Sequence, residues 1–296
     1  SFSGPGGQGA INVLLFVPNR ITGAAPCFVL INNRGAKHTD PTRQVQSPFW
    51  PAEDLIARGY AAAVFENADV DPDVDDGFKN GVHGVFDARD KPRAGDAWGT
   101  IAAWAWGASR VMDYLQTDAQ IDARRVALVG HSRGGKTALW AGAQDERFAL
   151  VVANNSGSTG AALARGKQGE KIAKINAGFP HWFTANYKKF GDKENELPVD
   201  QHQLLSLIAP RLLYIASATE DAWADPEAEF ASGVAASPVY ELFGRKGLSR
   251  NSLPKPETPL LDGHIGYHLR TGKHDLTPYD WARFMDFADR HLPRRL

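Results

Sequence analysis

The sequence predicts an α/β fold, a three-layer αβα sandwich with a mostly parallel central sheet. Short apolar runs alternate with amphipathic stretches from about residue 11 to the end, as they do when helical crossovers join parallel strands. Most runs are apolar throughout, which indicates strands buried on both faces. With 296 residues and one cysteine, Cys27, the chain can bury a large core without disulfides or a structural metal. We expect a single domain over 1–296.

Seven apolar runs are predicted to form the strands of this sheet. They are Ile11–Val17, Cys27–Asn32, Tyr60–Phe65, Val126–Gly130, Leu150–Asn154, Arg211–Ala218 and Ile265–Arg270.

Helical spacing is clearest in two segments. In 99–115 one stripe carries Trp104, Ala108, Val111 and Leu115. The second helix closes the chain: Thr277 is a suitable N-cap, Pro278 suits the first helical position, and Asp280 lies in the first turn. Its inward-facing side chains are Trp281, Phe284, Ala288 and Leu292.

Three irregular segments, 69–96, 156–210 and 244–263, are rich in Gly, Pro, Asp, Lys and Asn. Structureless segments of this length inside a domain are usually functional, so we expect them to form the walls of a site. The first carries an acidic run that invites a calcium interpretation, but the glycine and the distal glutamate of a calcium loop are out of register. We favour a solvated loop for Asp69, Asp71, Asp73, Asp75 and Asp76.

The charge balance excludes several partners. With 33 Lys and Arg against 34 Asp and Glu, the formal net charge is -1, so the broad cationic surface needed for sequence-independent nucleic-acid binding is absent. Binding to anionic membranes is disfavoured for the same reason. The least charged stretch, Ala97–Ser109, has 13 residues, whereas about 20 are needed to span a bilayer. The chain carries no recognisable signal peptide, and it begins with Ser1.

The strongest local motif runs from Val126 to Thr137 and matches two patterns. Gly130-x-Ser132-x-Gly134 is a nucleophile elbow, whose glycines permit a tight strand-to-helix turn that presents a serine oxygen above the sheet. Gly130 followed after four residues by Gly135-Lys136-Thr137 is formally a P-loop. A P-loop also needs an acid after another apolar strand to hold Mg²⁺, but the run Val29–Asn33 ends in asparagines. We therefore favour the elbow.

An elbow requires an acid and then a histidine later in the chain, each after a strand. Asp221 and His274 meet this requirement, and the order Ser132, Asp221, His274 is that of the α/β-hydrolase fold. The imidazole takes the serine proton, and the carboxylate fixes its tautomer. Glu220 is a rival for the acid, because strand alternation leaves open which of the two side chains points inward.

The remaining histidines fit other roles. His131 lies inside the elbow and is expected to be a packed spacer. The spacing of His264 and His268 on a short strand indicates packing or a site rim rather than zinc. Donors to an oxyanion are expected from the amide of Arg133 and from the loop 32–35.

The chain resembles the glucuronoyl esterases, serine α/β-hydrolases that cleave the ester between 4-O-methyl-glucuronic acid of xylan and lignin alcohols. The similarity covers roughly 95–296 and is strongest to the bacterial branch. Beyond the elbow it rests on these segments: Ser132-Arg133-Gly134-Gly135-Lys136, 156–162, Phe179-Pro180-His181-Trp182-Phe183, 197–202, Asp221-Ala222-Trp223 and Gly272-Lys273-His274-Asp275.

The resemblance implies a role for each matching position. Ser132 is the nucleophile, His274 the base, and Arg133 a side-chain oxyanion donor beside its own amide. Substrate binding is assigned to Lys136, Trp223, Glu170 and Trp182. The departure is Asn155, where many relatives carry the glutamate that serves as triad acid; because asparagine bears no charge, we assign the acid to Asp221.

The sequence therefore predicts a carboxylic-ester hydrolase acting on glucuronoyl esters through an acyl-enzyme, with glucuronoxylan or a lignin–carbohydrate ester as its partner and with no cofactor or metal. A polymeric substrate implies secretion, and we expect a monomer. Three alternatives stay open: another carbohydrate or xenobiotic esterase on the same fold, a nucleotide-binding P-loop protein, and a catalytically idle carbohydrate-binding relative.

Overall fold

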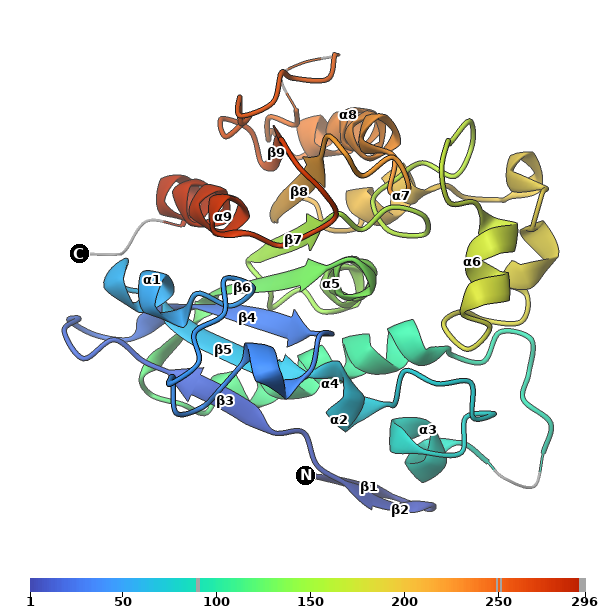
Figure 1. Ribbon diagram of the computed structural model, residues 1–296, viewed down its shortest axis with the longest axis horizontal. Helices are drawn as coiled ribbons and strands as arrows, with labels where there is room; N and C mark the ends of the chain where they lie inside the picture. Colours follow the sequence, from blue (N-terminus) through green and yellow to red (C-terminus); the bar gives the residue numbers. More distant parts are fainter. Residues whose placement is uncertain (89–90, 249, 251, 293–296) are drawn as a thin grey trace.

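The computed structural model describes residues 1–88, 91–248, 250 and 252–292. Its centre is a seven-stranded sheet in the order β3-β5-β4-β6-β7-β8-β9 (Figure 1). All neighbouring pairs are parallel except β3 and β5. Each predicted strand is present within a few residues of its expected bounds. The strands are β3 Val13–Phe16, β4 Ala25–Asn32, β5 Ala61–Glu66, β6 Ile121–His131, β7 Leu150–Asn154, β8 Leu212–Ala218 and β9 Ile265–Arg270.

Helices cover both faces of the sheet. One hydrophobic core contains Cys27, Val29 and Ile31 of β4. It lies on the face of the sheet covered by α4 Thr100–Leu115, α5 Arg133–Gln144 and α8 Pro226–Leu242. The alternate residues Phe28 and Leu30 belong to the core under α1 Ala52–Ala57 and α9 Pro278–His291. Both side-chain sets of a strand are therefore buried, which explains the continuous apolar runs. The predicted αβα sandwich of the α/β-hydrolase type is confirmed.

Two of the three segments predicted to be irregular, 69–96 and 156–210, contain short helices. They gather at the edge of the sheet toward which the arrowheads of β4, β6 and β7 point (Figure 1). The expectation of structureless walls is wrong for these two segments, whereas the described residues of 244–263 form no helix or strand. The helices outside the main layers are η1 Ala36–His38, α2 Asn67–Val70, α3 Gly81–Phe86, α6 Ile172–Gly178, η2 Tyr187–Phe190, η3 Glu194–Glu196 and α7 Gln201–Ser206.

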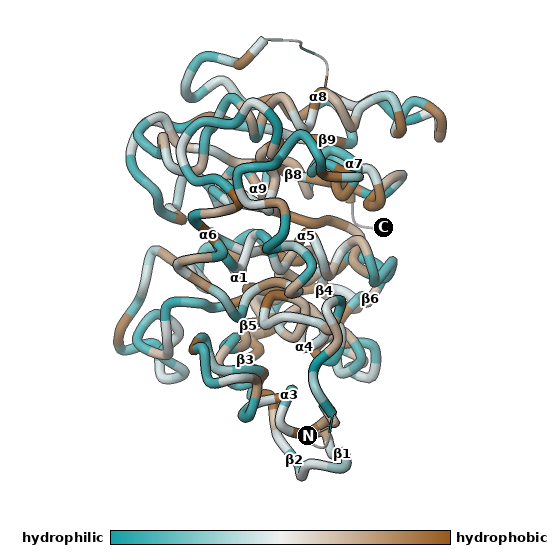
Figure 2. The backbone as a smooth tube through the Cα atoms, turned by 90° about the vertical axis from the view of Figure 1, so that its right-hand side faces the viewer, coloured by the Kyte–Doolittle hydropathy of each residue, from teal (hydrophilic) through white to brown (hydrophobic). Residues whose placement is uncertain are grey.

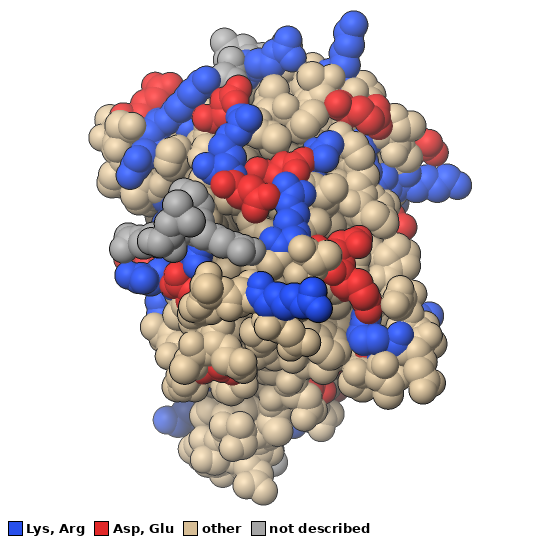
Figure 3. Space-filling model, turned by 90° about the vertical axis from the view of Figure 1, so that its left-hand side faces the viewer, with Lys and Arg blue, Asp and Glu red and all other residues tan. Residues whose placement is uncertain are grey.

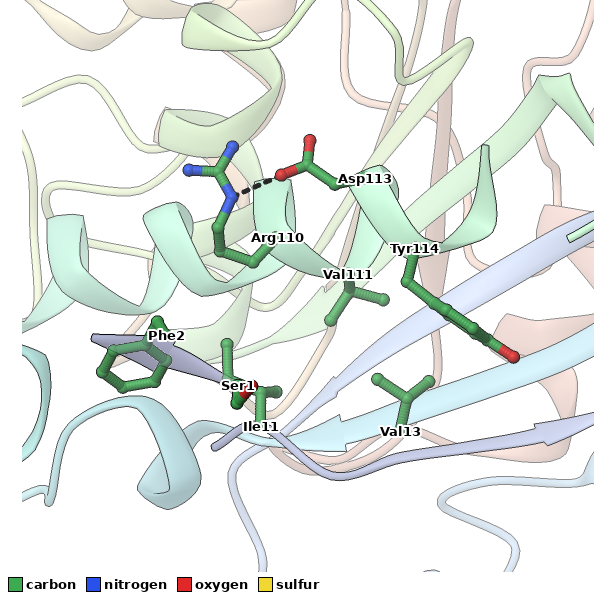
Figure 4. Close-up of a pocket in the computed structure, with 8 residues that line it drawn as sticks. All are labelled: Ser1, Phe2, Ile11, Val13, Arg110, Val111, Asp113 and Tyr114. Carbon is green, nitrogen blue, oxygen red and sulfur yellow. Dashed lines mark hydrogen bonds and ion pairs between the residues drawn. The ribbon is translucent and has the colours of Figure 1, made fainter. Parts of the chain in front are cut away.

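A small hairpin of β1 Phe2–Gly4 and β2 Gly7–Gly9 lies at one end of the molecule (Figure 2). Phe2 contacts the rings of Phe86 and Trp106. Beside the hairpin, α4 and the start of β3 enclose a pocket of about 420 Å³ (Figure 4). None of the residues that line it is a predicted site residue.

Surface charge agrees with the balanced composition. On the face drawn in Figure 3, basic and acidic side chains are interspersed. None of the helices within the described residues is both long and apolar enough to cross a bilayer.

A buried polar cluster joins β9 to α9. Asp280, which is fully buried, accepts hydrogen bonds from His268 Nε2 at 2.8 Å and from Arg270 Nε at 2.9 Å. Its other carboxylate contacts are with Thr277, the residue that caps α9. Arg270 Nη2 in turn donates to the carbonyls of Lys273 and Asp275, both at 2.8 Å. The cluster therefore fixes the turn between β9 and α9.

Replacing Asp280 with alanine should destabilise the fold by about 3–5 kcal/mol, because it leaves the buried Arg270 unpaired. Urea unfolding measures this loss. Asp286→Ala on the same helix is the control: its ion pairs with Arg58 and Arg283 are partly exposed, and each should be worth about 1 kcal/mol or less. A larger loss at Asp286 than at Asp280 would contradict the assignment.

The loss of stability caused by Asp280→Ala should also depend on pH. Burial alone would raise the pKa of Asp280, but the hydrogen bond and charge of His268 and the charge of Arg270 hold it below its ordinary value of 3.8. A lowered carboxyl pKa contributes stability above the unfolded value and loses it as the pH falls through the folded value. The difference in the free energy of unfolding between wild type and Asp280→Ala should therefore shrink below about pH 4.

Candidate active site

Ser132 occupies a sharp turn between β6 and α5. Its backbone lies at φ 56° and ψ -121°, a strained conformation that non-glycine residues rarely adopt. Close backbone approach makes the turn possible: a Cβ on Gly130 would lie 1.9 Å from the carbonyl oxygen of Gly134. The amide of Ser132 donates to the carbonyl of Asn154 at 2.9 Å. The structure therefore has the backbone of a nucleophile elbow.

His274 and Asp221 form a hydrogen-bonded pair near this turn. Nδ1 of His274 lies 2.6 Å from Oδ2 of Asp221, and the ring centre of His274 lies 4.6 Å from that of His131, which precedes Ser132. Asp221 follows β8 and His274 follows β9. The parallel strands thus bring the loops that carry the serine, the imidazole and the carboxylate to one edge of the sheet.

The acid of the pair is buried and ionised. Burial would raise the pKa of Asp221, but the hydrogen bond and charge of His274 and a hydrogen bond from Asn155 hold it below its ordinary value. Asn155 Nδ2 donates to Asp221 Oδ2 at 2.9 Å. Asn155, the residue at which the chain was expected to depart from the family pattern, therefore donates to the carboxylate. Glu220 is exposed, and its amide donates to the carbonyl of Gly272 at 2.9 Å.

Arg133 is the first residue of α5, so its amide has no partner within the helix. Its guanidinium pairs with Asp73 and lies 4.9 Å from the ring centre of Trp182. The prediction of a solvated acidic loop is wrong for Asp71, which is buried against His83. Asp73 is exposed as predicted, but its carboxylate accepts hydrogen bonds from His181 and Trp182.

Trp182 lies behind Arg133 rather than on an open surface. It is 4% exposed, and one face of its ring stacks on Phe179 with the ring centres 3.7 Å apart. We therefore reassign Trp182 from sugar contact to support of Arg133.

Lys136 is buried. It is therefore neither a solvated residue on the surface of a helix nor an open ligand for a phosphate. Its Nζ donates to the carbonyls of Ser156 at 2.5 Å and Ser158 at 2.7 Å. Burial lowers the pKa of Lys136 to about 8, although the charges of Glu170 and Glu229 act in the opposite direction. With two of its three N–H donors on backbone carbonyls, Lys136 does not have the free ammonium of a P-loop lysine.

The predicted sugar residues Glu170 and Trp223 lie together. The amide of Glu170 donates to the carbonyl of Trp223 at 3.0 Å. Trp223 is 45% exposed, which suits a stacking surface, and Lys174 Nζ lies 4.0 Å from its ring centre. Lys167, which sequence analysis missed, holds the same loop by donating to the carbonyls of Trp223 and Ala224.

A second residue missed from the sequence is Glu229 of α8, which is fully buried. Its carboxylate accepts from the amide of Gly157 at 2.8 Å and from Ser217 Oγ at 2.7 Å. Burial raises the pKa of Glu229 to about 7 despite these hydrogen bonds. No sequence motif marks Lys167 or Glu229, because Lys167 reaches Ala224 and Glu229 reaches Gly157 across more than 50 residues.

In the loop 32–35, one of the expected oxyanion donors is already used. The amide of Arg34 donates to Asn32 Oδ1 at 2.9 Å, so it is not available to an oxyanion. The Arg34 side chain instead lies 3.1 Å from His131 Nε2 and 2.6 Å from Asp275. His131 is buried, as expected of a packed spacer.

The other histidines and acids do not form a metal site within the described part of the chain. His268 is fully buried and bonded to Asp280 and Tyr214, whereas His264 lies near the ring of His291. No group of three or more His, Cys, Asp or Glu among the described residues is arranged to hold a metal ion.

Comparison with known proteins places this site in a family context. Residues 33–244 match the family described as glucuronyl esterase, fungi. The chain is 48% identical to carbohydrate esterase MZ0003 from an unknown prokaryotic organism, over 86% of this chain and 59% of that protein. It is 32% identical to 4-O-methyl-glucuronoyl methylesterase 1 from Phanerochaete chrysosporium, over 64% of this chain and 41% of that one. It therefore spans about half the length of these two relatives.

The fold is also similar to that of a solved glucuronoyl esterase from Solibacter usitatus. The TM-score is 0.88 at 41% identity, over 94% of this chain and 77% of that chain.

Removing the charge of Asp221 should disable the site. Asp221→Asn is expected to slow the reaction of Ser132 with a fluorophosphonate by up to about 10⁴-fold, since the imidazole loses the carboxylate that fixes its tautomer. The exposed neighbour provides the control, and Glu220→Gln should react at the wild-type rate. Equal losses in both variants, or a loss only at Glu220, would reassign the acid.

Proposed function

The chain belongs to the glucuronyl esterase family, and from this premise we propose that it is a serine carboxylic-ester hydrolase. It cleaves esters of 4-O-methyl-glucuronic acid, such as those joining glucuronoxylan to lignin alcohols. The observation that carries this proposal is that the Ser132 elbow lies at the same edge of the sheet as the His274–Asp221 pair. The hydrogen bond within that pair is 2.6 Å long. No cofactor enters the reaction.

The proposed reaction begins at His274. Because its Nδ1 donates to Asp221, Nε2 is the nitrogen that can take the proton of Ser132 Oγ. The oxygen then attacks the ester carbonyl carbon. The resulting oxyanion accepts hydrogen bonds from the backbone amide and the guanidinium of Arg133. The tetrahedral intermediate collapses as His274 gives the proton to the leaving alcohol, which leaves an acyl-enzyme on Ser132.

Water completes the proposed cycle. His274 removes a proton from the water, the hydroxide oxygen attacks the acyl carbon, and the proton returns to Ser132 Oγ as the glucuronate departs. Asp221 stays ionised throughout and stabilises the imidazolium. The lowered pKa of Asp221 suits this role.

The sugar binds beside the elbow in this proposal. The half-exposed indole of Trp223 offers a face for the pyranose ring, while Lys136 and Glu170 provide polar groups for its hydroxyls. Two donors of the Lys136 ammonium are used by carbonyls, so one is left for the substrate. Trp182 contributes indirectly by supporting Arg133.

A broader ester specificity is the second candidate, because the 48% identical relative is named only as a carbohydrate esterase. Other carbohydrate or xenobiotic esters are then substrates of the same site. The buried ammonium of Lys136 argues against nucleotide binding, and the paired His274 and Asp221 argue against an idle carbohydrate-binding protein. We propose that the protein works outside the cell, where its polymeric substrate is found, and as a monomer.

The wild-type chain should hydrolyse methyl or benzyl glucuronate faster than simple acetate esters, and Ser132→Ala should abolish both activities. Alcohol release from each ester measures the preference. Hydrolysis of acetates without any action on the uronates would remove the proposed substrate while leaving an esterase. Loss of neither activity in Ser132→Ala would remove the mechanism.

Arg133→Ala should lower kcat by about 10²–10³-fold, the effect of removing one oxyanion donor. KM should change much less, since the donor acts mainly in the transition state. Arg124→Ala, whose side chain is 75% exposed on β6, is the matched control and should retain wild-type kinetics. An unchanged kcat in Arg133→Ala would exclude its side chain from the oxyanion site.

A further inference from the structure

We propose that Asp73 is a positioning residue that holds the guanidinium of Arg133 ready for the oxyanion. This inference rests on the proposed function, because it takes Arg133 as an oxyanion donor. Asp73 belongs to the acidic run that the sequence indicates to be a solvated loop, but its contacts place it at the elbow.

Both oxygens of the Asp73 carboxylate have partners. Oδ1 accepts hydrogen bonds from His181 Nε2 at 2.9 Å and from Trp182 Nε1 at 2.8 Å. Oδ2 pairs with Nη1 of Arg133. One carboxylate thus joins three segments that are distant in sequence: the loop after α2, the loop after α6 and the first residue of α5.

The charge needed for this role is maintained. Burial would raise the pKa of Asp73, but the hydrogen bonds from Trp182 and His181 and the charge of Arg133 hold it below its ordinary value. The carboxylate is therefore ionised at neutral pH. A hydrogen bond between two charged groups is about twice as strong as a neutral one.

The frame behind Asp73 is anchored to a helix. The carbonyls of His181 and Trp182 accept hydrogen bonds from the amides of Thr100 at 2.9 Å and Ile101 at 3.2 Å. These amides open α4 and have no acceptor within the helix. Asp73 is therefore held by a loop that is itself fixed to the end of a long helix.

Arg133 is confined from a second direction by aromatic rings. Its guanidinium carbon lies 4.9 Å from the ring centre of Trp182 and 5.3 Å from that of Phe179. A free arginine side chain samples many rotamers, and this freedom would have to be lost when the guanidinium meets the oxyanion. Asp73 and the rings remove this freedom beforehand. The ion pair is made at Nη1, and a guanidinium has five N–H donors, so others stay available.

A double-mutant cycle tests the proposal. Asp73→Asn, Arg133→Ala and the double variant are compared for kcat and KM on methyl glucuronate and for the labelling rate of Ser132 by a fluorophosphonate. Asp73→Asn should lower kcat and labelling by about 10–100-fold with little change in KM, the scale of a misplaced catalytic group. In the Arg133→Ala background the same substitution should have no further effect, because the residue through which Asp73 acts is gone.

Two variants separate positioning from folding. Asp76→Asn lies in the same loop and removes the charge of a carboxylate that accepts hydrogen bonds from the neighbouring residues Lys79 and Asn80; it should match wild type. Trp182→Phe keeps an aromatic ring but removes the indole N–H that donates to Asp73, and it should lower kcat by about 2–10-fold. Thermal unfolding of each variant shows whether the chain is folded, and Trp182→Phe carries the test if Asp73→Asn is not.

The outcomes are distinct. The positioning role would be overturned if the fold-losses in kcat of the two single variants multiply in the double variant, or if Asp73→Asn has the wild-type kcat. Either result would leave the esterase intact. Failure of the wild-type chain to hydrolyse any glucuronate would overturn the proposed substrate, but the labelling rates would still measure the coupling of Asp73 to Arg133. A wild-type Ser132 that does not label would overturn both.

Discussion

The hydrogen bond between His274 and Asp221 is the interaction on which the rest of the site depends. It joins the loops after two neighbouring strands, β8 and β9, and most of the nearby buried polar contacts serve to keep these loops in place. Asn155 binds the carboxylate, Lys167 binds the backbone just beyond it, and Arg270 binds the carbonyls on either side of the histidine. The proposed chemistry at Ser132 requires that this pair stays near the elbow.

The strands and the elbow could be predicted because their signals are local. A strand buried on both faces is apolar along its whole length, and the tight turn at Ser132 admits no side chain at Gly130. The order of Ser132, Asp221 and His274 then follows from the topology of a parallel sheet. These features depend on neighbours in the sequence, so a single chain reveals them.

The supporting residues could not be predicted, because their contacts link distant segments. Asp73 reaches Arg133 across 60 positions and Trp182 across 109, and an acidic run by itself indicates solvent exposure. Lys136 was expected at the substrate, but its two hydrogen bonds to the carbonyls of Ser156 and Ser158 could not be predicted. Helix α8 was missed because Pro238 lies inside it and because it shows no clear apolar stripe.

The position of β9 has a consequence for biosynthesis. This strand forms one edge of the sheet, and the turn that follows it carries His274, whereas the elbow lies more than a hundred residues earlier in the chain. A ribosome adds about 5–20 residues per second, so the elbow is made several seconds before His274, the proposed general base. The proposed site can therefore be complete only after β9 has been translated and has docked at the edge of the sheet.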